Sequence, residues 1–143
     1  MKEILNWKNC EEEFIKKVEV DNSKVNSIRK MCKARQKIIE NSNIDEETAS
    51  IIASDYYEII KELLIALLLK YGLKSFNHEC LISFFKKEHP EYEYEARVIH
   101  QLKEVRNRAT YDGVFVKKEY LLNNKLEFKH IIKLLNDLIS AKE

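Results

Sequence analysis

The residues best suited to chemistry lie in segment 105–113, which reads Val-Arg-Asn-Arg-Ala-Thr-Tyr-Asp-Gly. A row at helical spacing runs through it: Ile99, Leu102, Arg106 and Ala109. Arg106 therefore places a permanent charge at the edge of an apolar stripe, where desolvation is costly unless a partner is supplied. A guanidinium fork binds phosphate well, so Arg106 is a candidate phosphate ligand. Asn107 and Tyr111, one turn apart on an adjoining face, are candidates to orient Arg106 or its ligand.

Lys103, Arg108 and Asp112 are neighbours of this string and are further candidates for ligand binding. An alternative needs no ligand: Arg106 pairs with a carboxylate of a neighbouring helix, or lies along the stripe with its head in water. The sequence contains no metal-ligand spacing and no cofactor motif, so we expect neither a metal nor a cofactor.

A single helical domain is expected to position these residues. The length of 143 residues is close to the commonest domain size, and 45% hydrophobic with 34% charged residues suits a packed interior. Two glycines and one proline are too few for the many corners of a β-sandwich or barrel. We therefore expect an all-α fold, an antiparallel bundle of five to six helices.

Hydrophobic periodicity and capping residues predict six helices. They span about residues 2–20, 24–41, 45–71, 77–87, 92 or 93 to 110 or 111, and 124–140. Gly72 and Gly113 follow the third and fifth helices, where glycine can take the left-handed conformation that ends a helix. Residues 114–120 have a strand-like pattern, but a single short strand has no evident partner.

The third predicted helix is the longest and most apolar. Residues 63–69 are apolar on more than one face, so this helix must be covered on several sides. It belongs either at the centre of the bundle or at a dimer interface. We expect a two-fold dimer that buries apolar surface near residues 106–111.

Charge and cysteine content bear on the cellular setting. A formal charge of +1 gives no global attraction to nucleic acid or membranes, so any basic patch must be local. No apolar run approaches the roughly 20 residues that span a bilayer, and the N-terminus lacks the apolar core of a signal peptide. Cys10, Cys32 and Cys80 are odd in number and widely spaced, which favours reduced, buried thiols over disulfides or zinc. A cytoplasmic protein is expected.

Several segments together resemble the HEPN family, small helical bundles of prokaryotic toxin–antitoxin systems and of RNA-processing and defence proteins. Tyr56-Tyr57, Lys61 and residues 66–73 are similar to the family's long second helix and its turn. Residues 77–85 resemble the histidine-bearing short helix, and residues 106–111 occupy the place of the motif, an Arg followed after four to six residues by a His. The resemblance covers about residues 23–139. It implies a HEPN-like domain over 21–143 with an added N-terminal helix at 1–20, one structural domain overall.

The resemblance also implies a homodimer in which two motifs face each other across a cleft that, in active members, cleaves RNA without a metal. Histidine would exchange protons near pH 7 while arginine stabilises charge on phosphate. Here position 111 is Tyr, and no His follows Arg106 within six residues. A phenol is a poor general base at pH 7, although it can donate a hydrogen bond or stack on a base. Asp112 is a weaker substitute for the proton transfer.

The four histidines are His78, His89, His100 and His130. We expect each to have a structural role. His78 would cap or bridge helices, and His100, six residues before Arg106, would reach the cleft only from the side.

Three functions remain. The first is a HEPN-like dimeric module that binds RNA, a nucleotide or a nucleotidyltransferase partner through the Arg106, Asn107 and Tyr111 cleft, in a toxin–antitoxin or defence context. The second is a metal-independent ribonuclease toxin with an altered motif. The third is a non-catalytic helical adaptor. None involves a membrane.

Overall fold

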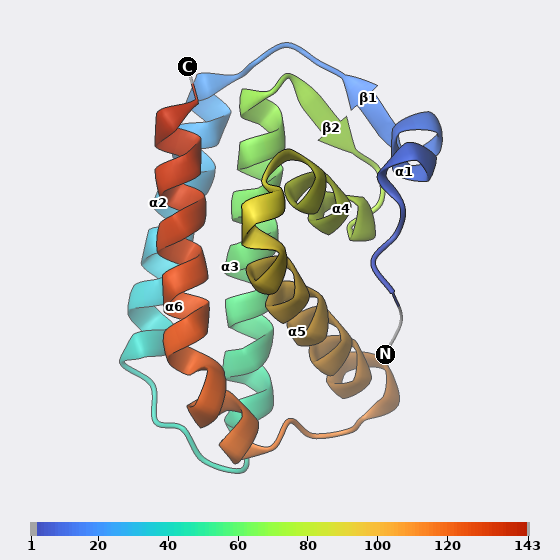
Figure 1. The fold of residues 1–143 in the computed structure, drawn as a ribbon. Helices are drawn as coiled ribbons and strands as arrows, with labels where there is room; N and C mark the ends of the chain where they lie inside the picture. Colours follow the sequence, from blue (N-terminus) through green and yellow to red (C-terminus); the bar gives the residue numbers. More distant parts are fainter. Residues whose placement is uncertain (1–2, 143) are drawn as a thin grey trace.

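The structure is a computed structural model that describes residues 3–142. In chain order the elements are α1 (Trp7–Glu13), β1 (Ile15–Lys17), α2 (Asn22–Glu40), α3 (Ala49–Lys70), β2 (Leu73–Ser75), α4 (Glu79–Glu88), a 3-10 helix (Pro90–Tyr92), α5 (Glu93–Asp112) and α6 (Lys118–Ala141). The long helices α2, α3 and α6 stand side by side, while α1, the two strands and α4 lie together beside one end of α3 (Figure 1). The expectation of a helical bundle is confirmed, with a small two-stranded sheet added.

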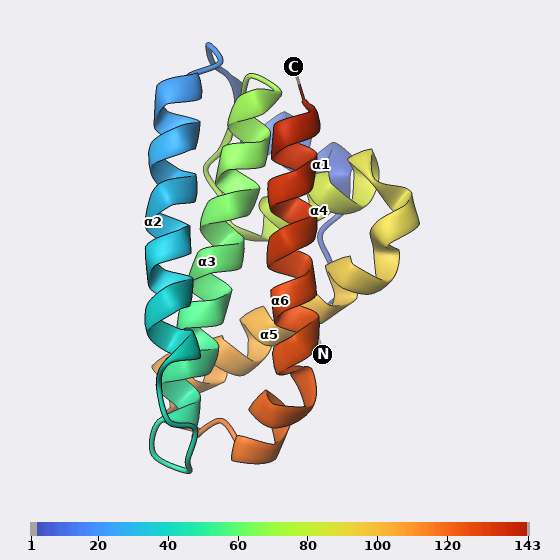
Figure 2. The same cartoon turned by 90° about the vertical axis from the view of Figure 1, so that its left-hand side faces the viewer.

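The long helices alternate in direction along the chain. Figures 1 and 2 show the chain descending α2, ascending α3, descending α5 and ascending α6. α2 therefore runs antiparallel to α3, as expected, whereas α5 runs back along the bundle at an oblique angle to α3 (Figure 2). However, α6 runs in the same direction as α3, because α5 intervenes in the chain between them.

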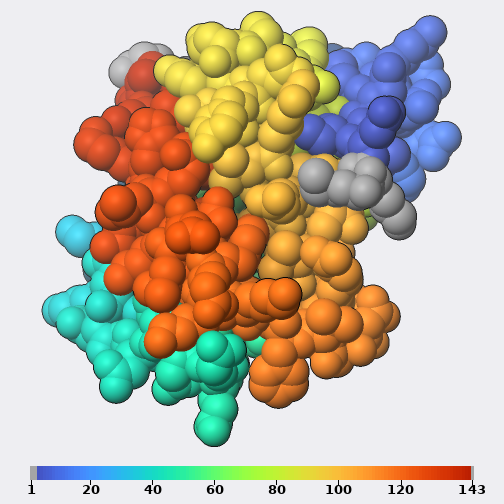
Figure 3. Space-filling view, turned by 60° about the horizontal axis from the view of Figure 1, so that its bottom comes forward, coloured from blue at the N-terminus to red at the C-terminus, as the bar shows by residue number. Residues whose placement is uncertain are grey.

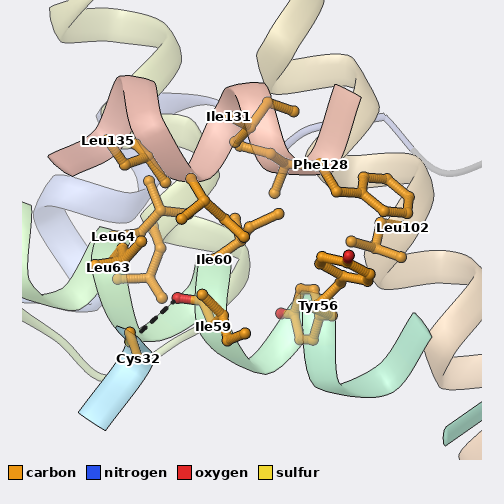
Figure 4. Packing of buried hydrophobic residues seen from close by; sticks show 14 of the residues in the cluster. Cys32, Tyr56, Ile59, Ile60, Leu63, Leu64, Leu102, Phe128, Ile131 and Leu135 are labelled. Carbon is orange, nitrogen blue, oxygen red and sulfur yellow. Dashed lines mark hydrogen bonds between the residues drawn. The ribbon is translucent and has the colours of Figure 1, made fainter. Parts of the chain in front are cut away.

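The centre of the core is α3. Its residues Leu63, Leu64 and Leu67 are at most 1% exposed, and α2, α4, α5 and α6 all pack against it. Figure 4 shows the apolar packing of α3 against Phe128, Ile131 and Leu135 of α6 and Leu102 of α5. Residues 63–69 are buried in one chain apart from Ile65, which is partly exposed. This apolar run is consequently no longer a reason to expect a dimer.

Two helices begin at other residues than expected. Before α3, Asp45 Oδ1 accepts hydrogen bonds from the backbone N–H groups of Glu47 and Thr48, at 2.8 and 2.9 Å, and these bonds lower the pKa of Asp45. This turn delays the helix until Ala49. In contrast, α6 begins early, at Lys118, and the preceding residues form no strand: the Val116 N–H donates to Ser50 Oγ at 2.7 Å.

The expected helix over residues 2–20 is right only for its middle part, α1, and residue 2 lies outside the described residues. The Asn6 side chain caps α1, which ends at Glu13, and β1 then pairs antiparallel with β2. Pairing with β2 satisfies backbone groups that a continued helix would have satisfied internally, so tertiary contact overrides the local periodicity. Gly72 has a φ of +70°, and a Cβ there would lie 3.0 Å from the Val18 carbonyl oxygen, so glycine is required where β1 crosses the end of α3.

A disulfide between Cys10 and Cys80 joins α1 to α4, so the expectation of reduced thiols is wrong for these two cysteines. Seventy residues separate them in the chain, and sequence spacing carried no sign that the fold brings them together. Cys32 remains a buried free thiol, and burial raises its pKa to about 11. The cysteines therefore no longer argue for a reducing compartment. Within the described residues, none of the helices is both long and apolar enough to cross a membrane.

Candidate functional site

One open pocket, of about 280 Å³, collects side chains from α3, the β2–α4 connection, α4 and α5. Its lining consists of Tyr57, Phe76, Asn77, His78, Glu79, Lys103, Arg106, Asn107 and Tyr111. The α5 contribution follows from helical spacing, because residues three or four apart share one face. Lys103, Arg106, Asn107 and Tyr111, all singled out from the sequence, are thereby brought to one wall.

Arg106 is held mainly by aromatic rings. Its guanidinium carbon lies 5.5 Å from the centre of the Tyr57 ring and 5.9 Å from that of Tyr111. Nη1 donates a hydrogen bond to Asn107 Oδ1 at 3.1 Å, whereas Nε is buried without a hydrogen-bond partner in the described structure.

Arg106 forms no ion pair with any carboxylate of residues 3–142, so the predicted pairing with a neighbouring helix is not present there. Cation–π contacts contribute about 0.5–2 kcal/mol and leave the positive charge uncompensated by any anion. The guanidinium is therefore free to accept an anionic ligand from the pocket.

The pocket has one buried and two exposed aromatic rings. Tyr57 is 4% exposed, and its burial raises the pKa to about 12 although the Arg106 charge acts in the opposite direction, so the phenol is neutral at pH 7. Tyr111 and Phe76 are 73% and 63% exposed. Lys74 Nζ lies 5.4 Å from the centre of the Phe76 ring. Exposed rings beside cations are suited to stacking on nucleobases.

Lys103 has a different role from Arg106, although both come from α5. Its side chain is 5% exposed, and Nζ lies 3.0 Å from Glu79 Oε1 and 3.3 Å from Glu104 Oε1. These two carboxylates neutralise the ammonium and tie α5 to the first turn of α4. Lys103 thus shapes the pocket wall without offering a free charge.

His78 lies in the same pocket, exposed at the residue before α4. The expected capping role is wrong, because its side chain makes no cap hydrogen bond and Asn77 Oδ1 instead accepts from the Glu79 N–H at 2.8 Å. Partial burial and the nearby Lys61 ammonium lower the pKa of His78 below its ordinary value, so its imidazole is neutral at pH 7. His89, His100 and His130 do not line this pocket.

Two candidates from the sequence lie elsewhere. Arg108 is exposed and lines a separate pocket of about 220 Å³ with Phe115 and Tyr120. Asp112, also exposed, does not line the Arg106 pocket. Two residues along a helix correspond to a rotation of about 200°, which directs Arg106 and Arg108 to different faces.

Sequence reasoning missed Tyr57, Phe76 and Glu79 as members of this site. Tyr57 and Glu79 gave a signal only as parts of the segments that carry the family resemblance, and Phe76 gave none. Phe76 follows directly on β2, a strand that the sequence did not predict. Its exposure could therefore be found only from the fold.

Comparison with protein-family models gives no match, and no curated protein or solved structure matches the chain. Fold and pocket together define a helical-bundle protein with an arginine held between two tyrosine rings at an open site. The geometry of this pocket is therefore the basis for its function.

Proposed function

We propose that the pocket binds the phosphate group of RNA or a nucleotide, with Arg106 as the principal ligand. The observation that carries the proposal is the half-buried guanidinium, which has two tyrosine rings beside it and forms no ion pair with a carboxylate of residues 3–142. Phosphate would supply the missing anion and accept hydrogen bonds from the guanidinium. Tyr111 and Phe76 would then stack on the adjoining base, and Asn107 would hold Arg106 in place.

The resemblance to HEPN proteins gives this binding a setting. By that resemblance the chain acts as a homodimer in a toxin–antitoxin or defence system, with two pockets across a shared cleft. A nucleotidyltransferase protein would be its partner at the same cleft. Size-exclusion chromatography with light scattering at micromolar concentration tests the dimer, and a monodisperse monomer would exclude it.

A second candidate, metal-independent RNA cleavage, is favoured by His78. Its neutral imidazole lines the same pocket as Arg106, although it comes from another segment than the family motif. An imidazole that exchanges protons together with a guanidinium that stabilises phosphate charge meets the two needs of attack by a ribose hydroxyl.

Binding is tested by fluorescence anisotropy with a labelled single-stranded RNA and with a labelled nucleotide. Arg106→Ala should weaken binding roughly tenfold or more, because a charge-assisted bond to phosphate is lost. Arg108→Ala is the matched control, since it removes the same side chain two residues away and outside the pocket. Equal affinity of the natural chain and Arg106→Ala would leave the helical adaptor as the better function.

Cleavage is tested on the same RNA in the presence of a chelator. His78→Gln should abolish any cleavage by the natural chain, whereas His89→Gln should not. Cleavage that survives His78→Gln would remove His78 from the mechanism while leaving the binding proposal in place.

A further inference from the structure

Three ionisable side chains meet where α5 and α6 adjoin, and none of them lines the Arg106 pocket. Glu95 lies on α5, while Glu127 and His130 lie on α6, three residues apart and therefore on one helix face. One donor atom from each of the three lies within 4.8 Å of the other two. Figure 3 shows α5 and α6 side by side on this face of the molecule.

No Lys or Arg side chain of the described residues pairs with the carboxylates of this cluster. Glu95 is largely buried, with 15% of its side chain exposed, and its Oε2 lies 3.7 Å from Nε2 of the exposed His130. Two carboxylates thus lie close together, one of them mostly withdrawn from water, and the His130 imidazole is the basic group beside them. A divalent cation would supply positive charge to this cluster.

We propose that Glu95, Glu127 and His130 bind a divalent first-row transition-metal ion, with Zn²⁺ as the best fit. Two carboxylate oxygens and one imidazole nitrogen form a donor set that suits Zn²⁺ and its neighbours, whereas Mg²⁺ and Ca²⁺ prefer oxygen alone. Ligands bound tetrahedrally at about 2.1 Å lie roughly 3.4 Å apart. The three donor atoms lie up to 4.8 Å apart, so side-chain rotations would bring them closer around the ion. Three protein ligands leave the remaining positions to water.

The ion would join α5 to α6 on a face that the RNA proposal does not use. It was not foreseen from the sequence, because only Glu127 and His130 are close in the chain and one Glu-x-x-His pair is a weak signal. The third ligand, Glu95, lies near the start of α5. The rest of α5, the connection to α6 and the first turns of α6 separate it from Glu127 in the chain.

The test uses the full chain, stripped with a chelator and titrated with Zn²⁺ by calorimetry, with Mg²⁺ as the comparison ion. We expect one Zn²⁺ per chain, and Glu127→Gln and His130→Gln should each weaken binding by roughly tenfold or more. Asp137→Asn is the matched control, because it neutralises an exposed carboxylate of the same helix outside the cluster. RNA binding should be unchanged in Glu127→Gln, which separates this proposal from the one for Arg106.

A second measurement uses the natural chain alone and does not depend on the folding of variants. In the NMR spectrum, Zn²⁺ should shift the imidazole signals of His130 and leave those of His89 in place. Absence of saturable binding, or Zn²⁺ affinity that survives the double variant Glu127→Gln with His130→Gln, would overturn the proposal.

Discussion

Two arginines at the edges of the core have opposite surroundings. On α2, Arg29 Nε donates to Asn136 Oδ1 at 2.9 Å, and its Nη2 donates to the Asn136 carbonyl oxygen at 3.3 Å and to Ser140 Oγ at 2.9 Å. On α5, Arg106 has one hydrogen bond, to its neighbour Asn107, and two tyrosine rings. The hydrogen bonds of Arg29 join α2 to α6. Most of the guanidinium N–H groups of Arg106, in contrast, donate to no acceptor in the described residues.

The two regions around these arginines differ in the same way. In the α2–α3–α6 bundle, apolar side chains such as Phe128 are fully buried, and the Cys32 thiol donates to the Ile59 carbonyl oxygen at 3.7 Å. Around the pocket, Phe76 and Tyr111 are exposed although both are large and aromatic. Interactions in the bundle therefore stabilise the fold, while those at the pocket remain available to a ligand. Substitutions in the bundle should cost stability, and substitutions at the pocket should cost binding.

The largest loss of stability is expected from Phe128→Ala in the bundle. Phe128 is 0% exposed, and its ring centre lies 5.4 Å from that of Tyr56 and 6.2 Å from that of Tyr120. Truncation leaves a cavity and should lower the free energy of unfolding by about 3–5 kcal/mol. Urea denaturation followed by circular dichroism measures this loss. A loss below about 1 kcal/mol would mean that the bundle is less tightly packed than the structure indicates.

Removal of the disulfide should have the next largest effect. Cys10→Ala with Cys80→Ala releases the cross-link between α1 and α4, which closes a long loop of the unfolded chain. The free energy of unfolding should fall by about 2–4 kcal/mol. Cys32→Ala is the control for loss of a thiol without loss of a cross-link, and both variants are compared by urea denaturation. Equal stability of the natural chain with and without a reductant would contradict a stabilising disulfide.

The bundle could be foreseen from the sequence because its signals are local. The periodicity of the third helix, Asp21 before α2 and Gly113 after α5 each act within a few residues, so their elements were predicted closely, apart from the start of α3. The N-terminal segment could not be predicted in this way, since β1 exists only by pairing with β2, far along the chain.

The pocket was foreseen in part for the same reason. Arg106, Asn107 and Tyr111 share one helix, and helical spacing is enough to bring them together. Tyr57 and His78 come from other elements, so only the packing of α3, α4 and α5 reveals that they lie beside Arg106. Arg108 was wrongly predicted as part of this site. It is close to Arg106 in the sequence, but its side chain lies on another face of the helix.

The two arginines themselves give a direct test of the comparison. Arg29→Ala removes three hydrogen bonds to α6 and should lower the free energy of unfolding by about 1–3 kcal/mol, with RNA affinity unchanged. Arg106→Ala should cost less stability and lower RNA affinity. Urea denaturation and anisotropy on the same preparations measure both effects. If Arg106→Ala proved the more destabilising of the two, Arg106 would be a structural residue. The proposed difference between a stabilising Arg29 and a ligand-binding Arg106 would then be wrong.

The smallest cost to folding is expected from Tyr111→His, which nevertheless should create or strengthen RNA cleavage. Tyr111 is 73% exposed, so the exchange should change the free energy of unfolding by less than about 1 kcal/mol. If His78 takes no part in catalysis, the natural chain should cleave weakly or not at all, because a phenol at position 111 does not exchange protons readily at pH 7. Histidine at this position, beside Arg106, supplies a group that does, and general acid–base catalysis is typically worth about 10²–10⁴ in rate.

The measurement for this last prediction is metal-free cleavage of single-stranded RNA by the natural chain, by Tyr111→His, and by Tyr111→His combined with Arg106→Ala. Activity gained in Tyr111→His should be lost in the double variant, because without Arg106 no guanidinium stabilises the charge that develops on the phosphate. Strong cleavage by the natural chain that disappears in Tyr111→His would show instead that Tyr111 is itself catalytic. The protein would then be a ribonuclease and not a binding module, with the exposed Tyr111 as its catalytic residue.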